Sequence, residues 1–131
     1  MENTTKKERS GFQDFGEVNL TGNGGHGYIR LDWFTPEALP TWGDGRLLIL
    51  GDKGFIEIRK YTDLAKSEKG NHLFLANNDE VKYIDCSNVK LPYFSNLIND
   101  VSNRTVTACS QELTYLSMEL AIKAQELAEK K

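Results

Sequence analysis

The chain has 131 residues, of which 39% are hydrophobic and 27% are charged, and its formal net charge at pH 7 is −3. This length and composition are typical of one soluble globular domain with a sizeable core. The slightly negative charge argues against the basic face that nucleic-acid binding requires, and no apolar run is long enough to span a membrane.

The first residues and the cysteines both indicate a cytoplasmic protein. Residues 1–11 are polar and lack the apolar core of a signal peptide, so we expect a mobile polar arm before a single domain over residues 12–131. Cys86 and Cys109 are too few for a disulfide framework, which predicts two reduced, partly buried thiols.

A first hairpin is predicted near the N-terminus, beginning with a strand from Phe15 to Leu20. The glycines from Gly22 to Gly27 then match the G-x-G-x-x-G spacing of dinucleotide-binding loops. That motif requires a following helix whose N-terminus holds the pyrophosphate, whereas the residues that follow here alternate as a strand. Asn-Gly-Gly between two alternating runs instead predicts a hairpin turn, with His26 in solvent.

The second strand leads into a loop, and the two segments together hold both tryptophans. Period-2 alternation places Ile29, Leu31 and Trp33 on one face and Tyr28, Arg30, Asp32 and Phe34 on the other. The loop, Thr35 to Arg46, contains prolines and glycines that interrupt a strand ladder. Two interpretations are open: Trp42 covers the core while Asp44 pairs with Arg46, or these side chains bind a ligand.

Two further hairpins are expected after this loop. Strands from Arg46 to Leu50 and from Phe55 to Tyr61 flank a turn in which Gly54 is predicted to be left-handed, as in a three-residue hairpin loop with a bulge. A polar connection, Thr62 to Gly70, includes a short helical turn. It precedes a hairpin made of residues 71–76 and 81–86.

Two helices complete the predicted fold, and each has one apolar stripe. The stripes consist of Phe94, Leu97, Ile98 and Val101, and of Leu113, Leu116, Leu120, Ala124 and Leu127. Ser110 is a suitable N-cap for the second helix. Strands followed by helices predict an α+β domain with a mainly antiparallel open sheet, helices packed on one face and the other face exposed for association.

The exposed face of this predicted sheet mixes aromatic and charged side chains. Its members are Tyr28, Arg30 and Phe34 from one strand and Phe55, Arg59 and Tyr61 from another. If these two sides coincide, the composition is typical of a protein–protein interface. The alternative is a solvated face with scattered aromatic side chains.

Catalytic and metal-binding patterns are missing from the sequence. With only His26 and His72, and with no Cys-x-x-Cys, we expect no metal site. No Gly-x-Ser-x-Gly motif occurs, and the carboxylates show no convincing pair. We therefore expect no catalytic and no cofactor-binding residue in this chain.

Several segments together resemble the C-terminal domain of Gfo/Idh/MocA-type oxidoreductases, the relatives of glucose–fructose oxidoreductase and inositol dehydrogenase. The segments are Tyr-Ile-Arg-Leu-Asp-Trp-Phe-Thr-Pro from Tyr28, Trp-Gly-Asp-Gly-Arg from Trp42, residues 49–51, 54–61, 71–75 and 83–86, and the final helix. The resemblance covers nearly everything after Gly11.

This resemblance implies an enzyme that passes hydride between NAD or NADP and a sugar or polyol, with the cofactor held by an N-terminal Rossmann domain. Such enzymes also have a Glu-Lys-Pro motif and an Asp-x-x-x-His motif, and neither occurs here. The chain therefore resembles the later portion of an oxidoreductase without its catalytic machinery.

We accordingly expect the substrate-side and dimerisation portion of such an enzyme, not catalytic by itself and binding no cofactor alone. Substrate contacts are assigned to Trp33, Trp42, Asp44 and Arg46, and self-association to the exposed sheet face. The alternative is a stand-alone interaction module that uses the same face to bind a partner protein.

Overall fold

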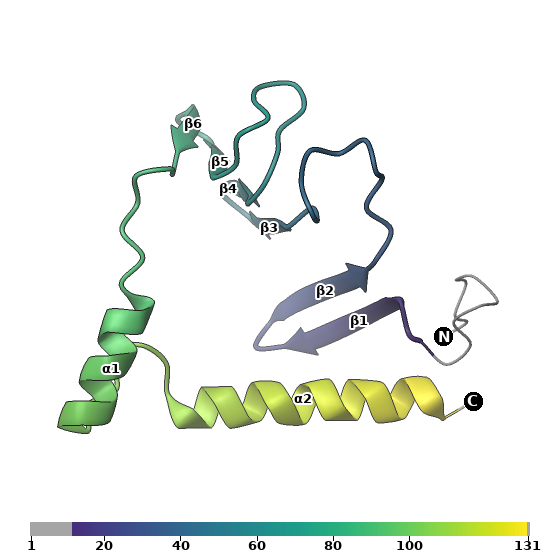
Figure 1. Ribbon diagram of the computed structural model, residues 1–131, viewed down its shortest axis with the longest axis vertical. Helices are drawn as coiled ribbons and strands as arrows, with labels where there is room; N and C mark the ends of the chain where they lie inside the picture. Colours follow the sequence, from purple (N-terminus) through teal and green to yellow (C-terminus); the bar gives the residue numbers. More distant parts are fainter. Residues whose placement is uncertain (1–11, 131) are drawn as a thin grey trace. The chain divides into compact units, whose positions relative to one another are not determined.

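A computed structural model of the protein describes residues 12–130. These residues form two helices and six antiparallel strands in two open sheets, so the predicted α+β class is confirmed (Figure 1). The chain divides into two compact units, one from residues up to Asp32 and from Lys90 onward, the other from Trp33–Val89. The predicted arm, residues 1–11, lies outside the described residues.

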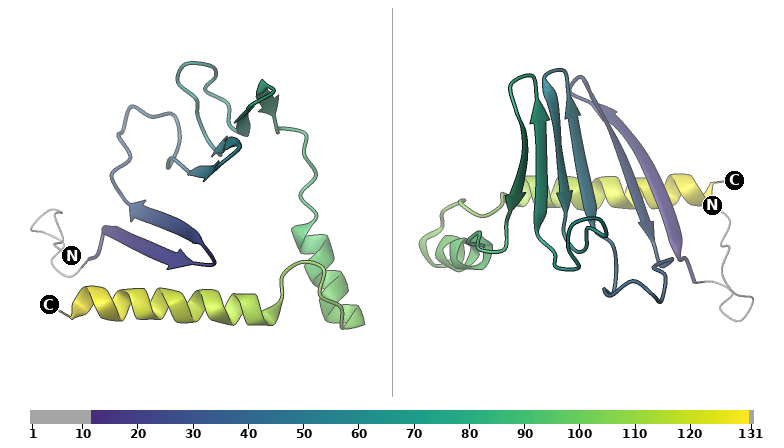
Figure 2. Two further views of the ribbon diagram at one scale, coloured as in Figure 1. Left: turned by 180° about the vertical axis from the view of Figure 1, so that it is seen from behind. Right: turned by 90° about the horizontal axis from the view of Figure 1, so that it is seen from above.

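The first unit contains a two-stranded hairpin, β1 (Phe15–Gly22) and β2 (Gly25–Asp32), shown in purple and blue in Figure 2. Asn23 and Gly24 form its two-residue turn, with φ of 49° and 76°. Two consecutive positive φ values are typical of a type I′ turn, for which Asn-Gly is the preferred sequence. The predicted hairpin turn is confirmed, and His26 is exposed within β2.

The same unit contains both helices, α1 (Tyr93–Asn103) and α2 (Gln111–Glu129). The hydroxyl of Ser110 accepts a hydrogen bond from Leu113 N at 3.1 Å, which confirms the predicted N-cap. α1 ends at Arg104, whose φ of 55° and ψ of 40° are left-handed. No residue of either helix is buried, and the apolar stripes are exposed apart from Ala124, which is half-buried.

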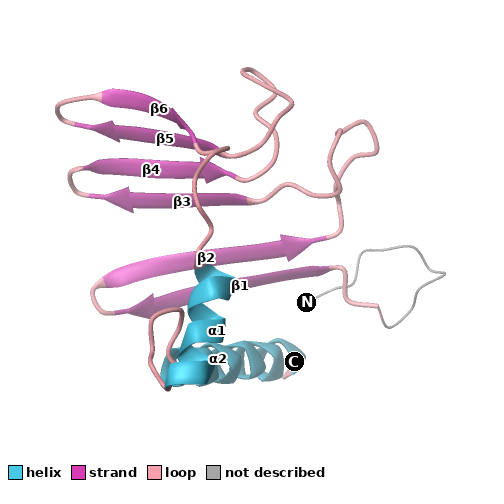
Figure 3. Ribbon diagram, turned by 60° about the vertical axis from the view of Figure 1, so that its left-hand side comes forward, coloured by secondary structure: helices cyan, strands magenta, loops and turns pink. Residues whose placement is uncertain are grey.

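The second unit is built on a four-stranded sheet of two hairpins, and its strands lie in chain order (Figure 3). The strands are β3 (Arg46–Gly51), β4 (Gly54–Arg59), β5 (His72–Asn77) and β6 (Val81–Asp85). The six described strands thus form two sheets rather than the single sheet expected. β3 is an edge strand of its sheet, and all of its residues are exposed.

The register of this sheet separates its side chains into two faces of different character, since residues directly opposite each other point the same way. The mixed face consists of Arg46, Leu48, Leu50, Phe55, Glu57, Arg59, His72, Phe74, Ala76, Val81, Tyr83 and Asp85. The aliphatic face consists of Leu47, Ile49, Ile56, Ile58, Leu73, Leu75, Lys82 and Ile84. One face is therefore almost purely apolar, whereas the other combines rings and charges.

The β3–β4 turn differs from the prediction. Gly51 pairs directly with Gly54, so the loop has two residues rather than three. Gly54 has φ of 149° rather than a left-handed value. Its Cα approaches the neighbouring strand so closely that a Cβ there would collide with Ala76 O and lie 2.9 Å from Asn77 Cα. Only glycine fits this close approach of two backbones.

The connection between β4 and β5 is a tight turn rather than the expected helical piece. Asp63 and Ser67 form an isolated antiparallel bridge, and Asp63 Oδ1 accepts a hydrogen bond from Ala65 N at 3.0 Å. Asn71 N donates to Lys60 O at 3.1 Å, which closes the base of the turn. This arrangement buries Asp63, which is 5% exposed, at one end of the mixed face.

Candidate functional site

The loop before β3 presents two tryptophan rings to solvent. Trp33 and Trp42 meet edge to face, with ring centroids 5.5 Å apart and an angle of 86° between the planes. Their exposed fractions are 61% and 81%. A T-shaped pair is a favourable aromatic geometry, so the two rings form a rigid and accessible apolar surface. Trp42 does not cover a core in the described structure.

The charged residues at the end of this loop pair with each other. Asp44 Oδ2 accepts from Arg46 Nε and lies 2.8 Å from Arg46 Nη2. Lys60 N donates to Gly45 O at 2.8 Å and fixes the start of β3. The structure therefore places the four predicted substrate residues in one unit as two pairs, Trp33 with Trp42 and Asp44 with Arg46.

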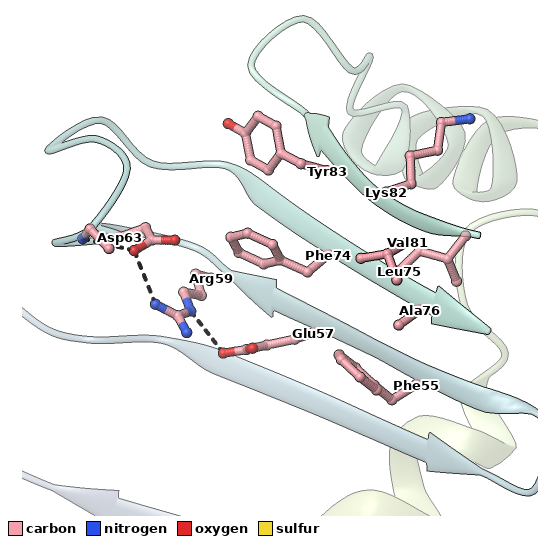
Figure 4. A pocket seen from close by; sticks show the side chains of 11 residues that line it. Phe55, Glu57, Arg59, Asp63, Phe74, Leu75, Ala76, Val81, Lys82 and Tyr83 are labelled. Atoms are coloured by element: carbon pink, nitrogen blue, oxygen red, sulfur yellow. Dashed lines mark hydrogen bonds and ion pairs between the residues drawn. The ribbon is translucent and has the colours of Figure 1, made fainter. Parts of the chain in front are cut away.

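The mixed face of the four-stranded sheet has a shallow hollow of about 350 Å³ (Figure 4). Phe55, Ala76 and Val81 lie at one end of it, with Lys82 beside Val81, and Arg59 and Asp63 lie at the other end. Two predicted interface residues, Phe55 and Arg59, are among its lining. The hollow thus has a mainly apolar end and an end that carries the Arg59–Asp63 ion pair.

Arg59 is the centre of the end that carries this ion pair. Its Nε donates to Glu57 Oε1 at 2.8 Å, and its Nη1 lies 3.2 Å from Asp63 Oδ1. Its guanidinium also lies over the Phe74 ring, 5.4 Å from the centroid, a cation–π arrangement. The hydrogen bond to Glu57 raises the pKa of Arg59, so the group stays cationic at any physiological pH.

Tyr83 is held from three sides. Its ring lies 5.4 Å from that of Phe74 and receives the Lys66 ammonium 4.1 Å from its centroid. Its hydroxyl lies 2.8 Å from Nδ1 of His72, whose Nε2 contacts the Lys69 carbonyl. Because a carbonyl oxygen only accepts, Nε2 carries the hydrogen, and whenever the ring carries one hydrogen Nδ1 accepts from the Tyr83 hydroxyl. Burial raises the pKa of Tyr83.

These contacts offer charged groups, hydrogen-bonding groups and aromatic rings at one end of the hollow. Hydrogen bonds from Ser87 lower the pKa of Asp85 at the neighbouring end of β6. Among residues 12–130, no group of three His, Cys, Asp or Glu side chains could hold a metal ion.

The sequence interpretation missed Asp63, Phe74, Tyr83 and His72 as members of this site. Phe74 and Tyr83 lie opposite Glu57 on the same face of the sheet once the register of β4, β5 and β6 is known. The β5–β6 part of that register follows from the hairpin turn between those strands, but the β4–β5 part does not, because residues 60–71 separate the two strands. Asp63 could not be placed either, because its position depends on the tight turn that was expected to be helical.

The six predicted interface residues lie in both units. Tyr28 and Arg30 are on β2, where the Tyr28 hydroxyl donates to Glu17 Oε2 at 3.1 Å and Arg30 Nε donates to Asp32 Oδ2 at 2.7 Å. Phe34, Phe55, Arg59 and Tyr61 belong to the other unit. Phe55, Arg59 and Tyr61 lie on or next to β4, and Phe34 follows β2.

The glycine-rich segment does not fit a nicotinamide nucleotide. Gly22 to Gly27 form the β1–β2 turn and the strand ends beside it, so the segment leads into strand β2 and not into a helix. A pyrophosphate site needs such a terminus. Both cysteines are free thiols; Cys86 is half-buried, and Cys109 is exposed rather than partly buried as expected. No helix in the described chain is long and apolar enough to cross a membrane.

Comparison with solved structures finds a protein that is similar to nearly the whole chain. The chain is similar to the crystal structure of a putative oxidoreductase from Erwinia carotovora atroseptica SCRI1043, with a TM-score of 0.88 and 40% sequence identity. The match covers 95% of this chain but 38% of that protein, so the chain resembles one portion of a longer polypeptide. No protein-family model matches the chain, and no curated protein matches it.

Proposed function

We propose that this chain is the substrate-side and dimerisation portion of a nicotinamide-dependent oxidoreductase that acts on a sugar or polyol. The observation that supports this proposal is the structural match to the Erwinia protein, which spans 95% of the chain at 40% identity. The match covers only 38% of the larger protein. The reaction would therefore require residues that lie outside this chain.

The Trp33–Trp42 loop supplies the proposed substrate contacts. A sugar or polyol offers apolar C–H groups and several hydroxyls, so its site needs a flat apolar surface beside directional polar groups. The exposed tryptophan rings provide the surface. Asp44 and Arg46 provide charged hydrogen-bonding groups, which bind hydroxyls more strongly than neutral ones. The prolines of the loop fix φ at their own positions and so restrict where these side chains can lie.

NAD or NADP would supply the hydride chemistry of the complete enzyme. The glycine-rich segment is a hairpin turn that no helix follows, so we assign the cofactor to residues outside this chain. The chain's own part would be to bind and orient the substrate and to hold two subunits together.

The test uses a chimera in which this chain replaces the matching portion of the Erwinia oxidoreductase. Trp42→Ala and Asp44→Asn should each lower kcat/KM about tenfold, or ~1.4 kcal/mol of transition-state stabilisation, while Tm stays within a degree or two. Leu64→Ala, an exposed apolar residue outside the loop, serves as the control. If both loop variants lower Tm and keep full activity per folded molecule, the loop is structural and the substrate assignment is wrong.

A second candidate function is a stand-alone interaction module. The observation that favours it is the mixed face, where Phe55, Arg59 and Tyr83 combine rings and charge as protein interfaces do. A native transcript that joins this chain to a nucleotide-binding domain would exclude this alternative. A mature product without such a domain would support it.

A further inference from the structure

Two arginines lie directly opposite each other on the mixed face. Asp44 and Glu57 each precede an arginine by two residues, a spacing that places both members of a pair on the same side of an extended chain. The β3–β4 register then pairs Arg46 with Arg59. Like charges directly opposite each other are destabilising, so the arrangement depends on how the nearby carboxylates are shared between the two guanidinium groups.

Arg59 engages two of the three carboxylates in this cluster. Its Nε donates to Glu57 Oε1 at 2.8 Å, and its Nη1 lies 3.2 Å from Asp63 Oδ1. The Glu57 and Asp63 side chains are 23% and 7% exposed, so each would be costly to leave without a cation. Arg46 pairs with Asp44, and these side chains are 55% and 34% exposed. The loop pair is therefore the more exposed and the weaker one.

We infer that Arg59 is a positioning residue for the proposed substrate site. By holding the Glu57 carboxylate, Arg59 leaves Arg46 to pair within the loop. The inference rests on the function proposed above for the loop, and it adds a residue of β4 that acts through the Asp44–Arg46 pair rather than on the substrate itself.

Glu57 is within reach of Arg46 once Arg59 no longer occupies it. Glu57 lies opposite Leu48, which is two residues along β3 from Arg46 and on the same face. Such diagonal neighbours are about 7–8 Å apart, a distance that long side chains span. An unpaired, partly buried carboxylate costs more than an exposed ion pair gains. Arg46 should therefore leave Asp44 for Glu57 when the charge of Arg59 is removed.

Backbone and charge both connect the loop to the end of β4. Lys60 N donates to Gly45 O at 2.8 Å, which holds the segment that carries Asp44 beside Arg59. The hydrogen bond to Glu57 is the main cause of the raised pKa of Arg59, and the negative charge of Asp44 adds to it. The positive charge of Arg59 thus acts on both members of the loop pair, because it attracts Asp44 and repels Arg46.

Nuclear magnetic resonance of the Arg46 Nε–H group in the full chain shows which carboxylate this group contacts. With Arg59 present, Asp44→Asn should shift the Arg46 signal more than Glu57→Gln does. Arg59→Met removes the charge but keeps a long side chain, and in this background the order should reverse. The Arg30 Nε–H group is the internal reference, since it pairs with Asp32 in the other unit and should not respond.

An Arg46 signal that stays more sensitive to Asp44→Asn in the Arg59→Met background would overturn the inference. Arg59→Lys is the matched control, because it retains the positive charge and should keep the order seen with arginine. If Arg59→Met fails to fold, Arg59→Gln makes the same test, since its uncharged amide can still donate a hydrogen bond to Asp63.

The activity of the chimera described above gives an independent measurement. Arg59→Met should lower kcat/KM about tenfold, as expected for Asp44→Asn. Adding Glu57→Gln to Arg59→Met should restore kcat/KM to within about twofold of the wild type, because no carboxylate then draws Arg46 out of the loop. If Arg59 served stability alone, removing a second charged group would bring no recovery, and that result would overturn the positioning role.

The two measurements separate this inference from the function proposed for the loop. A reversed order of the Arg46 responses with unchanged kcat/KM would support the positioning role and show that the loop does not bind the substrate. An unchanged order with a lowered kcat/KM would overturn the positioning role and leave the substrate assignment in place.

Discussion

Both carboxylate oxygens of Asp100 accept a hydrogen bond from the backbone N–H of Thr107, at 2.9 and 2.8 Å. Asp100 also accepts from Ala108 N at 2.8 Å and from the Thr105 hydroxyl at 2.7 Å. A single side chain of α1 therefore organises the connection that leads to the N-cap of α2.

These contacts predict a dependence of stability on pH. Desolvation raises the pKa of Asp100, but hydrogen bonds from Ala108, Thr105 and Thr107 outweigh it and lower the pKa to about 2. A carboxyl whose pKa is lower in the folded state stabilises the fold above its unfolded pKa, about 3.9, and loses that contribution as pH falls toward 2. Unfolding followed by helical circular dichroism should show this loss between about pH 4 and pH 2.

Asp100→Asn should remove this part of the pH dependence and lower stability at neutral pH, since an amide presents one acceptor oxygen instead of two. Asp79→Asn, an exposed residue of the β5–β6 turn, is the matched control. Equal acid sensitivity in the wild type and in the Asp100→Asn variant would contradict the role assigned to Asp100.

Asp63→Ala should destabilise the four-stranded unit by about 1–3 kcal/mol, the usual cost of losing hydrogen bonds to a charged group. The substitution removes the contact with Arg59 Nη1 and the acceptor for Ala65 N. Because both tryptophans belong to this unit, denaturant unfolding followed by tryptophan fluorescence measures its stability. A double-mutant cycle with Arg59→Ala should give a coupling of at least about 0.5 kcal/mol, and a coupling of zero would show that the two side chains act independently.

Gly54→Ala should be far more damaging than Gly51→Ala. At Gly54 a Cβ would collide with Ala76 O, and the φ of 149° is open only to glycine. We expect a loss of about 3 kcal/mol or more. At Gly51 the nearest atom to an added Cβ is Gly54 O at 3.7 Å, so that variant should stay within about 1 kcal/mol. Similar unfolding midpoints for the two variants would contradict the close approach of β4 and β5.

The chain alone should bind neither NADH nor NADPH, because its glycine-rich segment is a hairpin turn without a following helix. Titration with either cofactor, monitored by the fluorescence of its nicotinamide ring, should show no saturation up to about millimolar concentrations. A dissociation constant of that size corresponds to weak binding. Gly22→Ala provides the critical comparison, since a Cβ at Gly22 meets no atom within 4 Å. Micromolar binding that this substitution abolishes would revive the dinucleotide interpretation.

Much of the secondary structure could be predicted from local patterns. The Asn23-Gly24 turn, the strand alternation and the Ser110 cap each depend on neighbouring residues only, and each is confirmed. The division into two sheets could not be predicted, because the loop after β2 indicates a break in the chain's strand pattern but not whether β3 pairs with β2. The exposed stripes illustrate the same limit. Periodicity identifies Leu113 and Leu116 as apolar positions on one side of a helix, but it does not identify what covers them.

In the candidate site, too, only the features that depend on neighbouring residues could be predicted from the sequence. Alternation placed Phe55 and Arg59 on one side of their strand, and the pattern left an interface and a solvated face open as alternatives. The contacts of Arg59 also include Asp63 and Phe74. The tight turn after β4 positions Asp63, and the β4–β5 register positions Phe74. Local patterns specify neither, since both arise from contacts between residues distant in the sequence.

The edge strand β3 has a consequence for the handling of this chain. Leu47, Leu48, Ile49 and Leu50 are consecutive and 52%, 63%, 52% and 78% exposed, and no charged residue interrupts them. An apolar edge of this kind offers unpaired backbone groups to another strand, and natural sheets usually protect such edges with lysine, proline or a covering segment. Concentrated preparations of the chain should therefore aggregate by strand pairing along β3. Leu48→Lys, which adds a charge to this exposed edge, should slow that aggregation.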